Sequence, residues 1–187
     1  MITKGVIMAG GTGTRLYPLT ISLNKHFLPI YDKPMIYYSL SALLIAGVKE
    51  ILIVTNPKDM DSFKNLLKDG SQLGIHISYA VQDKANGIAD VFNYCEDFVN
   101  KQKFFLILGD NIFFGSYLSK YFQEAIKLND PALIFSYHIS NPKEYGVIEY
   151  GENKSKIIKI HEKPKKFISN DVVTGLYIYD SSVFSIF

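Results

Sequence analysis

The residues with the clearest chemical potential form a glycine-rich run near the start of the 187-residue chain. Positions 10–15 are Gly-Gly-Thr-Gly-Thr-Arg and directly follow an apolar stretch. Glycine accepts positive φ angles and close backbone approach, so successive N–H groups can converge on phosphate oxygens. Arg15 adds a planar, permanently charged guanidinium that suits a phosphate. The run therefore predicts a phosphate-binding loop made of Gly10, Gly11, Thr12, Gly13, Thr14 and Arg15.

Three kinds of phosphate-binding glycine loop compete for this run, and a turn without a ligand is a fourth interpretation. A Walker A loop requires Gly-Lys-Ser or Gly-Lys-Thr after a four-residue gap, which the run does not contain. A dinucleotide fingerprint that starts at Gly11 requires glycine where Leu16 stands, and an acid where the second strand ends in Thr55-Asn56. The nucleotidyltransferase pattern Gly-Gly-x-Gly-Thr-Arg matches throughout, so we favour it.

Two charged residues, Lys25 and Asp110, complete the candidate site. A lysine is usually a solvated surface charge, but Lys25 closely follows the glycine loop, and this position favours a phosphate contact. Asp110 follows the most apolar strand of the chain, in Gly109-Asp110-Asn111, where a turn is the alternative interpretation. Magnesium takes one or two carboxylates together with substrate phosphates and water. We therefore expect Asp110 to be a magnesium ligand.

The other reactive side chains predict no second catalytic or transition-metal site. The four histidines show neither His-x-x-x-His nor His-Glu-x-x-His spacing. Cys95 falls on the apolar face of an expected helix and reads as a core residue. Glu162 and Lys163 follow one another at the end of a late strand, where a solvated edge is the alternative to a binding role.

The elements that must position these loops alternate in type over the first two-thirds of the chain. Short strands spaced by helices predict an α/β fold with a doubly wound, mainly parallel sheet and helices on both faces. Ligands of such sheets bind beyond the carboxyl ends of the strands, so loops 10–16 and 109–111 should share one rim. We expect strands at 5–9, 51–55, 75–81 and 104–108, and helices at 35–46, 63–67, 87–99 and after a capping Ser116.

The last third of the chain has a different rhythm. Four strand-like segments follow one another with no helix between them, so they are expected to extend the same sheet in antiparallel or mixed order. A short helix is expected to start at Asp180. No linker or internal repeat interrupts the sequence, which predicts one domain over residues 1–187. The four segments are 132–139, 147–150, 156–162 and 172–179.

Composition excludes several classes of function. Hydrophobic residues make up 48% of the chain and charged residues 20%, as in an ordinary globular protein. The net charge of +2 is too small for a dedicated nucleic-acid or membrane-surface protein. The single cysteine excludes an internal disulfide and fits a reducing compartment. The longest apolar run, 35–48, is shorter than the roughly 18 residues that a membrane span requires. We therefore expect a cytoplasmic protein with no nucleic-acid or membrane partner.

Taken together, these segments resemble the sugar-1-phosphate nucleotidyltransferases, and among them the glucose-1-phosphate thymidylyltransferases. The likeness runs through nearly the whole chain in one register. Any one segment alone would be weak evidence, but their number and order make the resemblance specific. They are Gly10–Thr20, Lys25 with Leu28-Pro29, Tyr31–Tyr38, Asp69–Gly74, Gln82, Gly87–Ala89, Leu108–Phe113, Tyr145–Val147, Glu162–Pro164 and Thr174–Asp180.

The resemblance implies a Rossmann-like sheet and a reaction with two substrates. An oxygen of glucose 1-phosphate attacks the α-phosphorus of dTTP, pyrophosphate leaves, and dTDP-glucose forms. Positioning and charge neutralisation dominate catalysis of this kind. The resemblance assigns residues 10–14 to the nucleotide and its phosphates, Arg15 to the leaving pyrophosphate and Lys25 to the phosphates at the reacting centre.

The resemblance also assigns the remaining site residues. Gln82 and Gly87 would contact the thymine edge, and Asp110 would hold Mg²⁺. The sugar would lie against Gly146, Glu162 and Tyr177, and its phosphate against Lys163.

Two departures from the family pattern affect these expectations. Asn24 stands where the family motif has serine, which we interpret as a small change beside Lys25. The family also continues beyond this length, through a second metal-binding aspartate and the helices of a tetramer interface. We therefore expect reduced turnover, and the resemblance implies a homo-oligomer, which is a tetramer in the family. Two alternatives stay open: a non-catalytic nucleotide- or sugar-phosphate-binding protein, and a nucleotidyltransferase for another base or sugar, such as a cytidylyltransferase.

Overall fold

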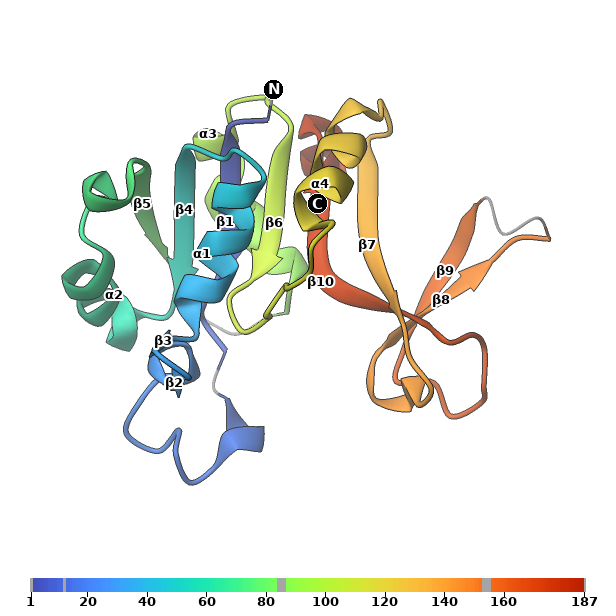
Figure 1. Ribbon diagram of the computed structural model, residues 1–187, viewed down its shortest axis with the longest axis horizontal. Coiled ribbons are helices and arrows are strands. Elements are labelled where there is room, and N and C mark those ends of the chain that lie inside the picture. Colours follow the sequence, from blue (N-terminus) through green and yellow to red (C-terminus); the bar gives the residue numbers. More distant parts are fainter. Residues whose placement is uncertain (1, 12, 84–86, 153–155, 187) are drawn as a thin grey trace. The chain divides into compact units, whose positions relative to one another are not determined.

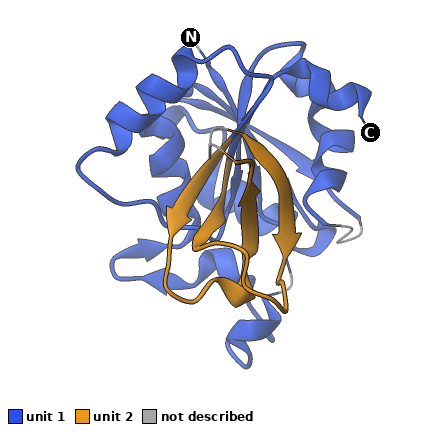
Figure 2. Cartoon of the chain, turned by 90° about the vertical axis from the view of Figure 1, so that its right-hand side faces the viewer, with its two compact units in different colours: residues 1–133, 177–187 blue, residues 134–176 orange. Residues whose placement is uncertain are grey.

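A computed structural model describes residues 2–11, 13–83, 87–152 and 156–186 of the chain (Figure 1). The chain folds into two compact units (Figure 2). The first contains Met1–Leu133 and Tyr177–Phe187, and the second contains Ile134–Leu176. None of the helices formed by the described residues has the length and apolar character needed to cross a lipid bilayer.

The first unit is built on a parallel sheet in the order β5-β4-β1-β6, with β10 next to β6. The strands β1, β4 and β6 are largely apolar runs without alternation, which is the pattern of strands buried on both faces. Val6, Ile7, Ile51, Ile53 and Leu106 are buried accordingly. This confirms the predicted parallel core. The parallel strands are β1 (Lys4–Met8), β4 (Glu50–Thr55), β5 (His76–Val81) and β6 (Phe104–Leu108). β10 (Asp171–Tyr179) belongs to this unit from Tyr177 onward and to the second unit before it.

Helices cover this sheet on its two faces, as expected. Figure 1 shows α1 in front of the strands and α3 behind them. Helix α1 packs on β1 and β6, and α3 packs on β4 and β5. Apolar side chains at helical spacing, such as Ile36, Leu40 and Leu43 of α1, supply the buried faces. The helices are α1 (Ile36–Ile45), α2 (Met60–Leu67), α3 (Phe92–Val99) and α4 (Leu118–Lys127), and a ribbon of β2 (Pro29–Ile30) and β3 (Lys33–Pro34) precedes α1.

The predicted start of α4 is wrong. Tyr117, not Ser116, is its N-cap residue, and no side chain accepts a hydrogen bond there. The backbone N–H of Leu118 donates to the carbonyl of Gly115, so Ser116 lies inside the preceding turn. Phe122 is the one residue of this helix that is fully buried. By contrast, Asp180 does start a short helix, a 3₁₀ segment over Ser181–Ser185, and its carboxylate accepts from the N–H of Ser182.

The second unit consists of antiparallel strands. β8 (Gly146–Tyr150) pairs antiparallel with β9 (Ile157–Glu162) and with β10. β7 (Ala132–His138) also pairs with β10, and the hydroxyl of Thr174 donates to the carbonyl of Phe135. The eight strands form one mixed sheet, as the lack of intervening helices predicted.

The parallel pairing of β1 brings the two predicted loops to one edge of the sheet. Met8 is in register with Val54 of β4 and with Leu108 of β6. The segments that follow β1 and β6 therefore leave the sheet side by side, and the N–H of Gly109 donates to the carbonyl of Met8 at 2.8 Å. A Cβ at Gly109 would lie 2.9 Å from that carbonyl oxygen and 2.8 Å from the ring of His26. Only glycine fits this crossing.

We predict that Gly109→Ala lowers the free energy of unfolding by about 1–3 kcal/mol, the usual cost of overpacking. The backbone of β1 lies on one side of the added methyl group and a buried ring on the other, so neither yields easily. Gly151→Ala is the control, because no atom of the described residues would lie closer than 3.7 Å to a Cβ there. Urea denaturation of both variants measures the effect, and equal stability would contradict the packing described for Gly109.

Candidate functional site

A pocket opens in the first unit where β1 and β6 end. Its volume is about 310 Å³, and an adjoining hollow of about 510 Å³ shares three of its residues. Those three are Arg15, Lys25 and Asp110. The structure thus brings together the arginine, the lysine and the carboxylate that sequence analysis selected.

Most of the residues predicted for the nucleotide line these two spaces. The first also contains His26 and Ile88, which sequence analysis did not assign to the site. Thr12 lies outside the described residues. The predicted residues are Gly10, Gly11, Gln82 and Gly87 in the first space, and Gly13 and Thr14 in the second.

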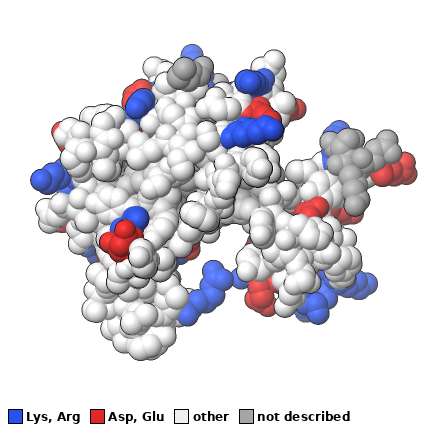
Figure 3. Space-filling model, in the orientation of Figure 1, with Lys and Arg blue, Asp and Glu red and all other residues white. Residues whose placement is uncertain are grey.

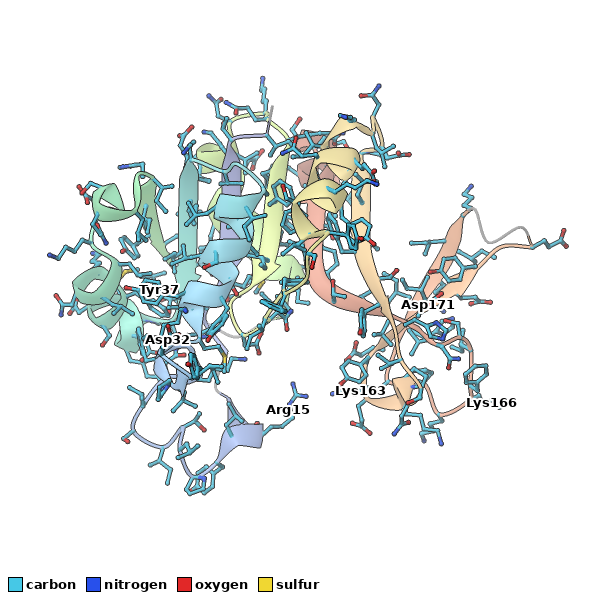
Figure 4. All side chains as sticks on the ribbon, viewed as in Figure 1. Arg15, Asp32, Tyr37, Lys163, Lys166 and Asp171 are labelled. Atoms are coloured by element: carbon cyan, nitrogen blue, oxygen red, sulfur yellow. The ribbon has the colours of Figure 1, made fainter. Side chains whose placement is uncertain are left out.

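The glycines of the loop are explained by the side chain of Lys25. A Cβ at Gly11 would lie 3.1 Å from Lys25 Nζ, and a Cβ at Gly13 would lie 3.2 Å from Lys25 Cβ. Gly13 also has φ +65°, which favours glycine, and its carbonyl accepts a hydrogen bond from the Thr20 hydroxyl. Gly11 and Gly13 therefore lie against the lysine, and the short 3₁₀ helix Thr14–Leu16 carries Arg15 as its middle residue. In Figure 4, Arg15 extends outward from this segment.

Lys25 and Asp110 form an ion pair across the pocket. Lys25 Nζ lies 2.5 Å from Asp110 Oδ2, and the two side chains are 16% and 30% exposed. Burial alone would raise the pKa of Asp110, but the hydrogen bond and charge of Lys25 outweigh it and hold the pKa below its usual value. The carboxylate therefore stays ionised, which a metal ligand requires.

A buried polar network that sequence analysis missed supports Lys25 from behind. Asn24 caps the 3₁₀ helix Lys25–Phe27, and its Oδ1 accepts from the backbone N–H of His26 at 3.0 Å. Its Nδ2 donates to Asp59 Oδ2 and to the carbonyl of Ala9. Asn24 is thus more than a small substitution for serine, because it connects the segments that follow β1 and β4. Its N-cap position before a helical turn is the one signal of this role in the sequence.

The same network determines the state of His26. Because the amide nitrogen of Asn24 faces a carboxylate and a carbonyl, its oxygen faces the ring and accepts from Nδ1 at 2.6 Å. Nδ1 therefore carries the proton. Nε2 is buried, and among the described residues it has no hydrogen-bond partner. Burial, followed by the charge of Lys25, lowers the pKa of His26 from 6.5 to about 4, so the ring is neutral near pH 7.

Gln82 closes the far side of the pocket. It follows β5, it is 5% exposed, and its N–H donates to the carbonyl of Thr55. Its amide nitrogen donates to Asp90 Oδ2 at 2.7 Å. Gly87 lies between Gln82 and Asp90 in the sequence. It has φ +95° and also lines the pocket.

The residues predicted for the sugar phosphate divide between the two units. Within the second unit, Gly146 of β8 is in register with Glu162 of β9, and a Cβ at Gly146 would lie 3.5 Å from Glu162 Oε2. Lys163 follows with φ 44°, its N–H donates to the carbonyl of Tyr145, and Figure 4 labels its side chain. Tyr177 belongs to the first unit, where it is buried. Its ring stacks on that of Tyr179, with 5.7 Å between the ring centroids. Their contact with a sugar stays a prediction.

The described residues contain no cluster of metal ligands, and the face shown in Figure 3 has no broad basic surface. No group of three or more potential ligands among His, Cys, Asp and Glu occurs in the described part of the chain. Figure 3 shows basic and acidic side chains in small, separate groups on that face.

Comparison with known proteins shows a close family likeness. The family model described as nucleotidyl transferase matches residues 4–187. The glucose-1-phosphate thymidylyltransferase of Neisseria meningitidis serogroup A is 48% identical over 95% of this chain and 62% of its own length. The enzyme of the same name from Mycobacterium tuberculosis is 44% identical over 98% and 63%. The chain spans about three-fifths of the length of these curated relatives.

Solved structures agree with this likeness. A putative glucose-1-phosphate thymidylyltransferase from Bacillus anthracis superposes with a TM-score of 0.89 at 42% identity, covering 97% of this chain and 73% of that one. A UDP-glucose pyrophosphorylase complexed with UDP-glucose superposes with a TM-score of 0.81 at 27% identity, covering 100% and 79%.

The neutral state of His26 predicts an acid-sensitive fold. In the unfolded chain the ring gains its proton near pH 6.5, whereas in the folded chain it does so near pH 4. The unfolded state thus binds more protons between these values, and the free energy of unfolding falls by about 3 kcal/mol as the pH drops from 6.5 to 4. Denaturant titrations at several pH values measure this slope. It should be smaller in His26→Gln and unchanged in His76→Gln, whose side chain is exposed; an unchanged slope in His26→Gln would refute the assignment.

Proposed function

Since this chain belongs to the nucleotidyl transferase family, we propose that it transfers a thymidylyl group from dTTP to glucose 1-phosphate, giving dTDP-glucose and pyrophosphate. The observation that carries the proposal is the pocket in which the glycine loop, Arg15, Lys25 and Asp110 meet. The names of relatives 44–48% identical to the chain support the choice of nucleotide and sugar.

The proposed reaction is one displacement at phosphorus. An oxygen of the sugar phosphate forms a bond to the α-phosphorus of dTTP, and the bond from that phosphorus to the oxygen that bridges it to the β-phosphorus breaks. The bridging oxygen leaves with pyrophosphate, so no covalent bond to the protein is needed. The protein contributes by orienting the two substrates and by placing fixed positive charge where negative charge develops.

The chain's own groups suit these two tasks. Gly10, Gly11, Gly13 and Thr14 of the glycine loop line the spaces beside Lys25, where we place the phosphates. Arg15 lies at the outer end of that loop and would contact the leaving pyrophosphate, while Lys25 would contact the phosphates nearest the reacting centre. Gln82 and Gly87, at the other end of the pocket, would contact the base. Gly146, Glu162, Lys163 and Tyr177 are proposed for the sugar phosphate.

Asp110 fits the role of a ligand for magnesium that arrives with the nucleotide. It offers one ionised carboxylate beside the proposed phosphate position, and magnesium commonly takes one or two carboxylates while phosphates and water fill its other positions. Bound magnesium would supply charge neutralisation to the phosphates. The ion pair with Lys25 keeps the carboxylate oriented into the pocket.

We predict that Lys25→Met lowers kcat/KM for dTDP-glucose formation by about 100-fold or more, because a preorganised charge at the reacting phosphates is lost. The loss should also weaken dTTP binding. Lys64→Met, on the exposed surface of α2, is the matched control, and its kcat/KM and dTTP affinity should equal those of the unsubstituted chain. Chromatographic detection of dTDP-glucose measures turnover.

A binding measurement tests the proposal whatever the turnover of the chain is. Thermal unfolding in the presence of magnesium and each nucleoside triphosphate should show the largest stabilisation with dTTP. Ligand at 100 times its dissociation constant adds about 2.7 kcal/mol to the free energy of unfolding. Stabilisation by none of the triphosphates, or by dCTP above dTTP, would contradict the proposed function.

A further inference from the structure

A carboxylate stands behind the glutamine at the base end of the pocket. Gln82 is 5% exposed and its amide nitrogen donates to Asp90 Oδ2 at 2.7 Å. Asp90 lies in the 3₁₀ helix Ala89–Val91 that leads into α3, and its other oxygen accepts from the side-chain amide of Asn93 at 3.2 Å. Both oxygens of the carboxylate are thus engaged, which holds it in place.

This contact determines which way the Gln82 amide faces. An ionised carboxylate only accepts hydrogen bonds, so the NH₂ group of the amide must face Asp90. The amide oxygen therefore points to the opposite side, where Oε1 lies 3.2 Å from the position of a Cβ on Gly10. Rotating the amide by 180° would place its oxygen beside the oxygen of Asp90, with no proton between two acceptors. Asp90 excludes that orientation.

The orientation has a consequence for base recognition. Gly10 and Gln82 both line the pocket, so an acceptor is presented there instead of a donor. Thymine and uracil carry a hydrogen on ring nitrogen N3 and can donate to such an acceptor. Cytosine has a lone pair at the same ring position, and it would face the lone pairs of Oε1. A buried acceptor left without a donor is expensive, so the two kinds of base should bind with different affinity.

We propose that Asp90 is a positioning residue for base selection: it fixes the Gln82 amide so that the pocket selects a pyrimidine with a ring N–H over cytosine. The inference rests on the proposed function, because it requires a nucleotide base in this pocket. It goes further by locating the discrimination in the pair of Gln82 and Asp90. It also explains why a buried glutamine is paired with an acid instead of with a group that can both donate and accept.

The experiment compares the binding of dTTP and dCTP to the 187-residue chain and its variants, with magnesium present, by calorimetry. Asp90→Asn preserves the size of the side chain but offers both donor and acceptor, so either orientation of Gln82 is satisfied. We expect the ratio of the dCTP to the dTTP dissociation constant to fall by about tenfold or more in this variant. Asp97→Asn makes the same change of charge on the exposed surface of α3 and should leave the ratio unchanged.

A second pair of variants shows whether Asp90 acts through Gln82. Gln82→Leu should lower the same ratio, and adding Asp90→Asn to it should lower the ratio no further, because the amide to be oriented is gone. A merely structural role of Asp90 would weaken both nucleotides equally and leave every ratio unchanged. Because each ratio is measured on one protein, a loss of stability in a variant does not imitate the expected result.

Each outcome decides between the claims. A preference for dTTP that survives Asp90→Asn, or an effect of Asp90→Asn that persists in the Gln82→Leu background, overturns the inference but not the proposed function. Equal binding of dTTP and dCTP by the unsubstituted chain also overturns the inference. Failure of that chain to bind any nucleotide overturns the proposed function and this inference with it.

Discussion

The parallel pairing of β1 with its two neighbours is the constraint on which the candidate site depends. Because parallel strands end at the same edge of a sheet, the segments after β1 and β6 leave it together, and so do Gln82 after β5 and Asp59 beyond β4. Residues far apart in the sequence thereby become neighbours around one pocket. The direct contact of Gly109 with the carbonyl of Met8 shows how closely the two loop-bearing strands must approach.

Within this frame, buried polar groups determine the directions of the site's side chains. Asn24 and Asp59 hold the helical turn that carries Lys25, and Lys25 in turn holds Asp110. Asp90 holds Gln82 in the same manner at the other end. For the amides of Asn24 and Gln82, an acceptor-only carboxylate leaves one orientation. Such groups are costly to bury without a partner, so a satisfied set specifies one arrangement of the pocket.

The sequence predicts the fold well where apolar runs are long and bounded by glycine, as at 104–108, which coincides with β6. It predicts that the glycine loop lies at this edge of the sheet, and the glycines there provide space for Lys25 and, at Gly13, a positive φ. Its contact with phosphate stays a prediction. It does not predict the network of Asn24, His26 and Asp59, because partners 35 residues apart meet only after the sheet forms. The cap expected at Ser116 was wrong because the spacing of apolar residues does not fix a helix start to within one residue, and the N-cap residue is Tyr117.

At the base end of the pocket, too, some site residues could be predicted from the sequence and others could not. Gln82 and Gly87 entered the predicted site through resemblance, since a lone glutamine after a strand has no pattern that marks it. Asp90 was not predicted at all, because its role appears only when the amide it faces is seen. What spacing predicts is which loop lies at which edge; what it leaves open is which atom of a polar group faces the ligand.

A crystal structure of this chain with dTTP and magnesium tests the central claim most directly. We expect the triphosphate to lie along residues 10–15, within contact distance of Arg15 and Lys25, with a metal at Asp110 and N3 of thymine beside Gln82 Oε1. A nucleotide bound elsewhere, or a triphosphate that leaves the glycine loop and Asp110 without contact, would contradict it.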